Sequence, residues 1–334
     1  MKIVAEISSN HSRNLHTACM MARKARSCGA DFVKFQAFIP DSITIPVKNE
    51  YFKYKNTYLY DLYKSIYLTR EDQESFIRFC KNEGIRVFGT VYCKDDVDFL
   101  ERFDLPYYKI SSFEASDLDF IECVASRGKP LIISLGCLYD DLYGKVIDIV
   151  KILDRYGVKN ESYLLHCVSK YPCDISELNF SAITKLKETL LNRFPSKNIG
   201  LSDHYPGIES AAIAAYMKLG MVEKHFTLNK EAIDGEYSLL PKEFKKMVST
   251  VKSIIINDSG KLVQYHGLAR SIFAVQDISR GQIFTEENIR IIRQWNGLAP
   301  DKYREILGKK CMKGIRAGTP LLIENILTQD IIQK

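Results

Sequence analysis

Short apolar runs alternate with longer amphipathic stretches over the first 256 residues of the chain. The short runs end at Gly, Pro or polar positions, which predicts strands. There are eight of them: Lys2–Ile7, Asp31–Gln36, Arg86–Val91, Tyr107–Ser111, Pro130–Ser134, Ser162–Val168, Asn198–His204 and Met221–Thr227. The longer stretches carry apolar residues at helical spacing. They predict helices at Leu15–Cys28, Arg70–Gly84, Asp95–Phe103, Leu118–Arg127, Tyr139–Tyr156, Asn179–Arg193, Gly207–Leu219 and Pro241–Ile256.

Each predicted strand is followed by a predicted helix, although a long polar and aromatic insertion, Ala37–Leu68, separates the second strand from its helix. Eight such units fit a closed (β/α)8 TIM barrel of ~250 residues. A doubly wound open sheet is the structural alternative. The count of eight favours the barrel, as does the absence of a Gly-rich GxGxxG turn after the first strand.

The pattern changes after residue 257. We predict a barrel domain at residues 1–257, a polar linker at 258–268 and a small β-rich domain at 269–334. The small domain has short β-type runs broken by glycines. Two short helices are expected in it, one near Glu286–Ile289 and one near Asp301–Leu307.

Composition bounds the class of protein. Hydrophobic residues make up 46% and charged residues 26% of the 334 residues, as in ordinary globular proteins. The net charge of +6 is mild and dispersed, so it does not indicate nucleic-acid binding. Nine cysteines without a CxxC pair favour reduced thiols over a disulfide framework. No apolar run approaches the ~18 residues of a membrane span. A soluble cytoplasmic protein is expected.

Two of the strand-like runs end in histidine. His204 and His225 lie 21 residues apart, with a helix-like stretch between them. If both runs are parallel strands, the helix returns the chain and both imidazoles emerge at one end of the sheet. Two imidazoles on one rim suit a divalent transition metal. The alternative is two unrelated histidines, one in a loop and one packed in the core.

Polar groups end the other strands too, where a barrel carries its chemistry. Lys34 and Lys109 interrupt apolar strands, and a charge there is costly unless it is paired or faces a polar cavity. Two lysines and several hydroxyls around one mouth would hold a phosphate or carboxylate group. Glu6 and Glu114 could instead simply balance the lysines. The strand-end groups that we select are Glu6, Asn10, Lys34, Gln36, Lys109, Ser112, Glu114, Ser134, Ser169, Tyr171, Ser202, His204 and His225.

Several segments resemble the sialic acid synthases, which are phosphoenolpyruvate-dependent enzymes that form C–C bonds. They run through the barrel in the family's order: Ala5–His11, Gly29–Gln36, Tyr108–Glu114, Leu164–Pro172, Gly200–His204 and Glu223–Leu228. The tail resembles the family's small antifreeze-like (SAF) domain at Arg270–Ile272, Asp277–Gly281, Asn288–Arg293 and Leu307–Lys309. The resemblance therefore covers nearly all of the chain.

The resemblance implies roles for individual residues. His204 and His225 match metal ligands, usually for Mn²⁺ or Mg²⁺. Lys34, Lys109 and Ser202 match groups that hold the phosphate and carboxylate of phosphoenolpyruvate. The implied reaction joins the enolpyruvate carbon to the open-chain aldehyde of an N-acetylated amino sugar, after which water adds and phosphate leaves.

Other roles concern the acceptor and a second subunit. Glu114 matches a carboxylate that accepts or orients a proton, and Glu6, Tyr171 and Asp234 match groups near the acceptor sugar. The resemblance also implies a homodimer in which the SAF domain caps the partner's barrel. Arg293 matches the arginine that reaches into that partner site.

The sequence departs from the family pattern at Leu135, Ser169, Gly235 and Gln294, mostly around the acceptor and the cap. Within the family, two segments look more like pseudaminic acid synthases, which accept a 2,4-diacetamido-trideoxyhexose: Ser112–Glu114 and residues 58–63. His166, in contrast, looks more like the corresponding residue of the N-acetylneuraminate group. We favour a pseudaminic- or legionaminic-type product. Another metal-dependent phosphoenolpyruvate-condensing barrel or an aldolase, and a catalytically degenerate sugar-binding scaffold, are the alternatives. An ice-binding tail is disfavoured because it lacks a regular Thr repeat.

Overall fold

The computed structural model describes residues 1–54, 56–138, 141–257 and 267–326. The chain forms two compact units, Met1–Ser259 and Gly260–Lys334, which are described separately. The predicted linker lies largely outside the described residues. Among the described residues, no helix combines the length and the apolar content that crossing a membrane requires.

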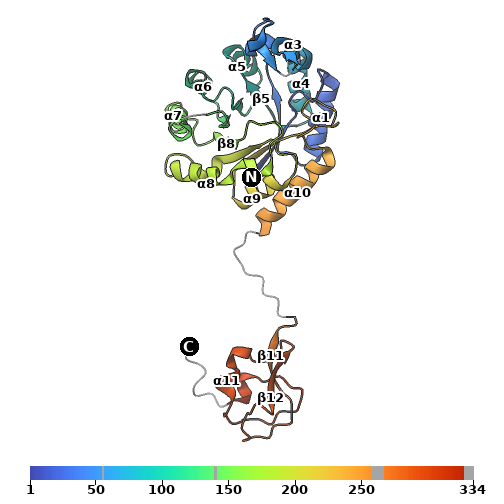
Figure 1. Cartoon of the computed structure of the whole chain (residues 1–334), viewed down its shortest axis with the longest axis vertical. Coiled ribbons are helices and arrows are strands. Elements are labelled where there is room, and N and C mark those ends of the chain that lie inside the picture. The colour runs from blue at the N-terminus through green and yellow to red at the C-terminus, as the bar shows by residue number, and fades with distance from the viewer. Residues whose placement is uncertain (55, 139–140, 258–266, 327–334) are drawn as a thin grey trace. The chain divides into compact units, whose positions relative to one another are not determined.

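The first unit is a closed barrel of eight parallel strands, which confirms the predicted fold class (Figure 1). The strands are β1 (Lys2–Glu6), β2 (Phe32–Gln36), β5 (Val87–Val91), β6 (Tyr108–Ile110), β7 (Leu131–Ser134), β8 (Tyr163–Cys167), β9 (Ile199–Asp203) and β10 (Met221–His225). The barrel closes where β1 pairs with β10, with Glu6 opposite His225. On its other side β1 pairs with β2, with Glu6 opposite Lys34. Three residues of the predicted site are therefore neighbours across the strands.

A helix follows each strand and lies outside the barrel (Figure 1). The helices are α1 (Leu15–Ser27), α4 (Arg70–Asn82), α5 (Lys94–Glu101), α6 (Leu118–Ala125), α7 (Leu142–Arg155), α8 (Phe180–Thr189), α9 (Glu209–Tyr216) and α10 (Pro241–Asn257). Local chemistry sets their ends: the side chains of Asn14, Thr69 and Asp117 cap the first turns of α1, α4 and α6. Gly29 follows α1 at φ +98°, a conformation that other residues rarely adopt.

Large side chains fill the interior of the barrel. Phe32, Phe88 and Tyr107 pack edge to face, with ring centroids 5.7–5.9 Å apart. They belong to a cluster of buried residues that point into the barrel: Val4, Phe32, Phe88, Tyr107, Ile132, Tyr163, Leu165 and Met221. A second, larger cluster fills the space between the strands and the helices. The barrel is therefore a packed core, and its chemistry is confined to its ends.

The insertion after β2 contains structure that the polar and aromatic pattern did not predict. It holds α2 (Pro40–Ile43), the 3₁₀ turn η1 (Glu50–Phe52), the antiparallel pair β3 (Lys53–Tyr54) and β4 (Thr57–Tyr58), and α3 (Leu59–Ile66). None of the side chains of α3 is buried, although four of its eight residues are large and apolar or aromatic at helical spacing.

The second unit is built on β11 (Arg270–Ala274) and β12 (Ile289–Arg293), which pair antiparallel. It also holds η4 (Pro300–Lys302), α11 (Tyr303–Ile306) and η5 (Ile323–Asn325), around a small core that includes Ile272, Phe284 and Leu321. The helix expected near Glu286–Ile289 is wrong. The Asn288 side chain accepts from the backbone N–H of Thr285 and donates to the carbonyl of Ile283, so it closes a turn there instead.

Candidate active site

A cavity of about 700 Å³ opens at the carboxyl ends of the barrel strands. It brings together most of the residues that the sequence selected, although they are spread over more than 220 positions. The cavity-lining members of that set are Glu6, Lys34, Gln36, Lys109, Ser112, Ser134, Ser169, Tyr171, Ser202, His204, His225 and Asp234.

A larger cavity of about 1320 Å³ lies at the opposite end of the barrel, where Lys2, Tyr107 and Tyr163 contribute. The Lys2 ammonium sits 4.8 Å from the centre of the Tyr163 ring and donates to the Tyr107 hydroxyl. No histidine lines this cavity among the described residues, although Asp31 and Glu161 do. Since barrel enzymes react substrates at the carboxyl ends of the strands, we place the chemistry in the smaller cavity.

Alternation along the strands decides which polar groups reach the cavity. On β10, Glu223 and His225 face it, whereas Lys224 points toward the helices. There the Lys224 ammonium meets the Asp203 carboxylate at 2.7 Å, and both side chains are fully buried. Asp203 also accepts a hydrogen bond from Ser210 of α9. This outward ion pair ties β9 and β10 to α9, so its function is structural.

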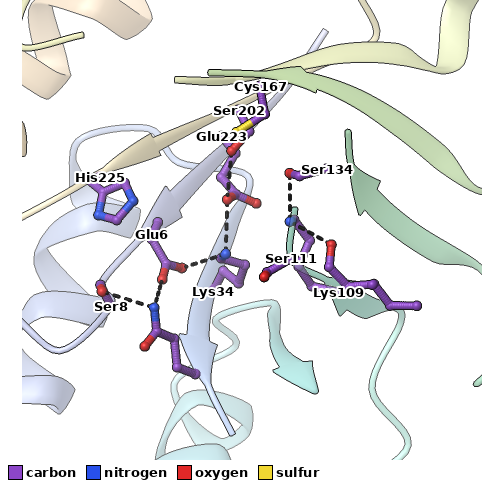
Figure 2. A network of polar contacts seen from close by, with 12 residues as sticks. Glu6, Ser8, Lys34, Lys109, Ser111, Ser134, Cys167, Ser202, Glu223 and His225 are labelled. Carbon is purple, nitrogen blue, oxygen red and sulfur yellow. Dashed lines mark hydrogen bonds and ion pairs between the residues drawn. The ribbon is translucent and has the colours of Figure 1, made fainter. Parts of the chain in front are cut away.

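Lys34 lines the cavity and lies between Glu6 and Glu223 (Figure 2). Its ammonium lies 3.2 Å from Glu6 Oε2 and 2.9 Å from Glu223 Oε1. Ser202 donates to the same Glu223 oxygen at 3.3 Å. Burial would lower the pKa of Lys34, but the two carboxylates outweigh it and raise that pKa. The lysine is therefore charged at neutral pH.

The two carboxylates differ in their protonation chemistry. Burial opposes the charge of Glu223, but Lys109 and Lys34 overcome it and hold its pKa at about 2. Burial raises the pKa of Glu6, and the charges of Lys34 and His225 only partly offset that effect. Glu223 is thus the permanent counter-ion, whereas Glu6 takes up a proton more readily.

Lys109 lies beside this triad. Its ammonium donates to Ser134 Oγ at 2.8 Å and to the carbonyl of Ile110 at 3.0 Å (Figure 2). Burial, with a smaller contribution from the charge of Lys34, lowers the pKa of Lys109 to about 8. No direct carboxylate contact is found for this ammonium among the described residues. An incoming anion would supply that counter-charge.

The two histidines meet at the rim, with ring centroids 5.3 Å apart. His204 Nδ1 lies 2.7 Å from the carbonyl of Val168, so this nitrogen carries the proton and the lone pair stands on Nε2. Burial lowers the pKa of His204 to about 3, which keeps the ring neutral. A neutral imidazole whose other nitrogen is fixed by a carbonyl is the form that binds metals.

His225 completes the pair. Its Nδ1 is buried without a hydrogen bond in the described structure and lies 3.4 Å from Asp234 Oδ2. Burial opposes the Asp234 charge, but contacts with His225, Ser8 and Tyr237 hold its pKa at about 2. No cluster of three or more His, Cys, Asp or Glu suited to a metal occurs among the described residues. Two imidazoles would hold a divalent cation only together with further ligands from water or substrate.

Glu114 stands just behind the cavity surface. Its carboxylate accepts a hydrogen bond from Ser111, whose side chain lines the cavity. Burial raises the pKa of Glu114, and the Ser111 hydrogen bond opposes that effect. A raised pKa makes this carboxylate a stronger base than an ordinary glutamate, and the acid–base role that the sequence resemblance implies stays a prediction.

Asn10, like Glu114, is a selected residue of the barrel unit that does not line the cavity. The Asn10 amide donates to the carbonyl of Phe226 and to Ser238 Oγ, both at 3.0 Å, and its oxygen accepts from the backbone of Asp234. Its hydrogen-bonding groups are thus partnered within the protein, where they hold the backbone of Asp234. Its role as a substrate ligand stays a prediction. Arg293 lies at the exposed end of β12 in the second unit.

The predicted site omits several cavity residues, among them Glu223 and Tyr237. Glu223 binds Lys34 directly, and the Tyr237 ring lies 4.9 Å from the His225 ring. Glu223 carried a usable signal, since it is two residues before His225 and therefore shares its face of the strand. Tyr237 follows β10 in a loop, where no periodicity indicates orientation.

Comparison with known proteins agrees with this geometry. Residues 21–261 match the NeuB family, and residues 269–327 match the SAF domain. A pseudaminic acid synthase of Campylobacter jejuni is 36% identical, over 96% of this chain and 94% of the other. One from Helicobacter pylori is 33% identical over 97% of both chains.

A solved structure shares the fold as well. The N-acetylneuraminic acid (sialic acid) synthetase of Leptospira borgpetersenii superposes with a TM-score of 0.68 at 28% identity. The match covers 79% of this chain and 87% of that one. The extent of these matches over the barrel and the tail decides the assignment: the chain belongs to the NeuB family, and a SAF domain follows its barrel.

Proposed function

We propose that this protein is a phosphoenolpyruvate-dependent nonulosonic acid synthase. It condenses phosphoenolpyruvate with the aldehyde of an N-acetylated amino sugar and releases phosphate. The observation that carries the proposal is the single cavity in which the buried cations Lys34 and Lys109 face the paired imidazoles of His204 and His225. Two pseudaminic acid synthases are 36% and 33% identical to this chain over nearly its whole length, which supports the same reaction class.

The chain's residues divide the chemistry between them. Lys109 and Ser134, with Lys34 and Ser202, bind and orient the phosphate and carboxylate of phosphoenolpyruvate. His204 and His225 would hold the divalent cation, Mn²⁺ or Mg²⁺. That cation supplies Lewis acidity toward the acceptor aldehyde.

Proton handling and acceptor binding fall to the carboxylates and tyrosines. Glu114 moves a proton to or from the water that adds to the phosphate-bearing carbon of the enolpyruvate, after its neighbouring carbon has bonded to the aldehyde. Asp234, Glu6 and Tyr171 contact the acceptor from the histidine side of the cavity. The Tyr171 and His204 rings lie against each other, with centroids 4.1 Å apart and planes inclined by 42°.

We propose a 2,4-diacetamido-trideoxyhexose as the acceptor, which makes the product of the pseudaminic or legionaminic type. The test is phosphate release from phosphoenolpyruvate and Mn²⁺ with a panel of N-acetylated hexoses. Release that requires both metal and one of these sugars supports the proposal. Release that is independent of sugar, or no release with any member of the panel, contradicts it.

The pH dependence follows from Lys109. We expect kcat/KM for phosphoenolpyruvate to fall as pH rises through about 8, because deprotonation removes a positive charge that attracts the anion. Lys109→Arg should abolish this decline, since a guanidinium stays charged over the whole range. Rates measured from pH 6.5 to 9.5 on both proteins check this. A parallel decline in the two would show that another group titrates.

We further propose a homodimer in which Arg293 of each subunit completes the partner's barrel site. Arg293→Ala and His225→Ala should each be inactive alone. After mixing under conditions that exchange subunits, they should recover about one quarter of the wild-type activity, since half of the dimers are mixed and each has one intact site. Mixed dimers isolated by two affinity tags and found inactive would contradict the shared site.

A further inference from the structure

Helix α3 carries an apolar stripe that the described protein core covers only in part. Leu59, Leu62, Tyr63 and Ile66 have the i, i+3, i+4, i+7 spacing of one helical face. A stripe of this kind normally packs against the interior, yet none of these side chains is buried. All four instead line the catalytic cavity. The wall that α3 forms is therefore apolar where the barrel end is polar.

Other elements extend this wall and hold it in place. Ile43 of α2 and the exposed Phe113 and Ile233 also line the cavity. The Tyr63 ring packs edge to face on Phe38, with centroids 5.6 Å apart. Phe38 is buried and packs in the same way on Tyr92, at 5.8 Å. The chain of aromatic contacts fixes α3 against the barrel.

The apolar wall lies close to the reacting groups. Burial and the charge of Glu114 raise the pKa of Tyr63, so its phenol lies within electrostatic range of that carboxyl group. The same cavity holds His204 and His225. A six-carbon acceptor whose aldehyde lies at the histidines therefore extends its remaining substituents within a space that α3 bounds.

We infer that the apolar face of α3 selects the acceptor by binding its deoxygenated end, the C6 methyl group of a deoxy sugar. This inference rests on the proposed function. A C6 hydroxyl placed against Leu59, Leu62 and Ile66 would lose water without gaining a partner from those side chains. The enzyme therefore prefers a 6-deoxy acceptor to its 6-hydroxy counterpart by about 10- to 100-fold, the range expected for a hydroxyl in an apolar pocket.

The experiment compares two acceptors that differ only at C6. They are 2,4-diacetamido-2,4,6-trideoxyhexose and the 2,4-diacetamido-2,4-dideoxyhexose of the same configuration. The ratio of kcat/KM for the 6-deoxy acceptor to kcat/KM for the 6-hydroxy acceptor is measured for the wild type and for Leu62→Asn. This substitution keeps the number and branching of the side-chain heavy atoms and introduces an amide. We expect the variant to lower the ratio about tenfold, mainly by slowing the 6-deoxy acceptor.

Two control variants accompany Leu62→Asn. Leu62→Met keeps an apolar side chain and should leave the ratio unchanged, and Lys64→Asn alters the exposed side of the same helix. Far-UV circular dichroism and binding of phosphoenolpyruvate with Mn²⁺ show whether each variant is folded. A second cavity variant, Leu59→Asn, repeats the test if Leu62→Asn fails to fold.

The outcomes separate this inference from the proposed function. A selective fall in the ratio supports the role of α3. An unchanged ratio, or an equal loss of activity on both acceptors, overturns it. Turnover of neither acceptor by the wild type would overturn the proposed acceptor and this inference with it, and phosphate release with no N-acetylated hexose would contradict the proposed function itself.

Discussion

His225→Ala is expected to abolish turnover, with a loss of at least ~10³-fold. The residue's Nδ1 is buried without a hydrogen bond, and its ring faces that of His204 across 5.3 Å. Removing it leaves a single imidazole, which holds a divalent cation weakly. Stabilisation by a metal at a polarised oxygen is worth several kcal/mol, and each 1.4 kcal/mol is about tenfold in rate.

Metal binding gives this prediction a readout that does not depend on activity. Titration of Mn²⁺, followed by electron paramagnetic resonance, should show one bound ion per wild-type chain and weakened binding in His225→Ala. His16→Ala changes an exposed histidine on α1 and serves as the matched control. Full activity of His225→Ala in a chelator-treated buffer would refute the metal assignment.

Lys34→Met is expected to damage both binding and stability. Lys34 is 5% exposed and neutralises Glu6 and Glu223, which are themselves buried. Breaking a buried pair by removing one partner costs about 3–5 kcal/mol, because an uncompensated charge remains. The variant should therefore unfold at lower urea concentration. It should also bind phosphoenolpyruvate at least ~10²-fold more weakly, since a charge-assisted contact is lost.

A second substitution separates the two effects. Lys34→Met combined with Glu223→Gln removes one of the unpaired carboxylates and should regain part of the lost stability, while phosphoenolpyruvate binding stays weak. Lys24→Met, at an exposed position of α1, controls for the loss of a lysine as such. If the double variant regained affinity together with stability, Lys34 would act only as a structural counter-ion.

The barrel could be predicted from the sequence because strand-like runs and stretches of helical spacing alternate eight times, over a length that suits such a barrel. Eight short apolar runs are each followed by a stretch of helical spacing, and the closed order of the strands in the structure follows that succession. Strand ends then predict the location of the site, because parallel strands bring their carboxyl ends to one rim. The gathering of Lys34, Lys109, His204 and His225 follows from these two regularities.

Side-chain partners could not be predicted in the same way. The Lys34–Glu223 contact depends on β1 lying between β2 and β10, so it needs the closure of the barrel and not only the count of strands. Asn10 looked like a strand-end ligand, yet its amide binds Phe226, Ser238 and Asp234, which are distant in sequence. Hydrogen bonds of this kind leave no local pattern.

Two further differences have local causes. The helix expected near Glu286–Ile289 does not form, because the Asn288 side chain satisfies backbone groups that a helix would use. The stripe of α3 is amphipathic, but the nearby β3–β4 pair and the many tyrosines of the insertion hide its period. Its orientation toward the cavity is a tertiary property, and the sequence predicts only that such a stripe needs a partner.

The central claim is that the paired cations and imidazoles of one cavity couple an enol phosphate, and not free pyruvate, to an acetamido sugar. Mass spectrometry of the product, with phosphoenolpyruvate or pyruvate supplied in parallel with Mn²⁺ and the trideoxyhexose, tests it most directly. The synthase forms an acid with the mass of the acceptor plus one pyruvic acid only from phosphoenolpyruvate, with one phosphate released per product. The same product formed from pyruvate would identify an aldolase and contradict the account.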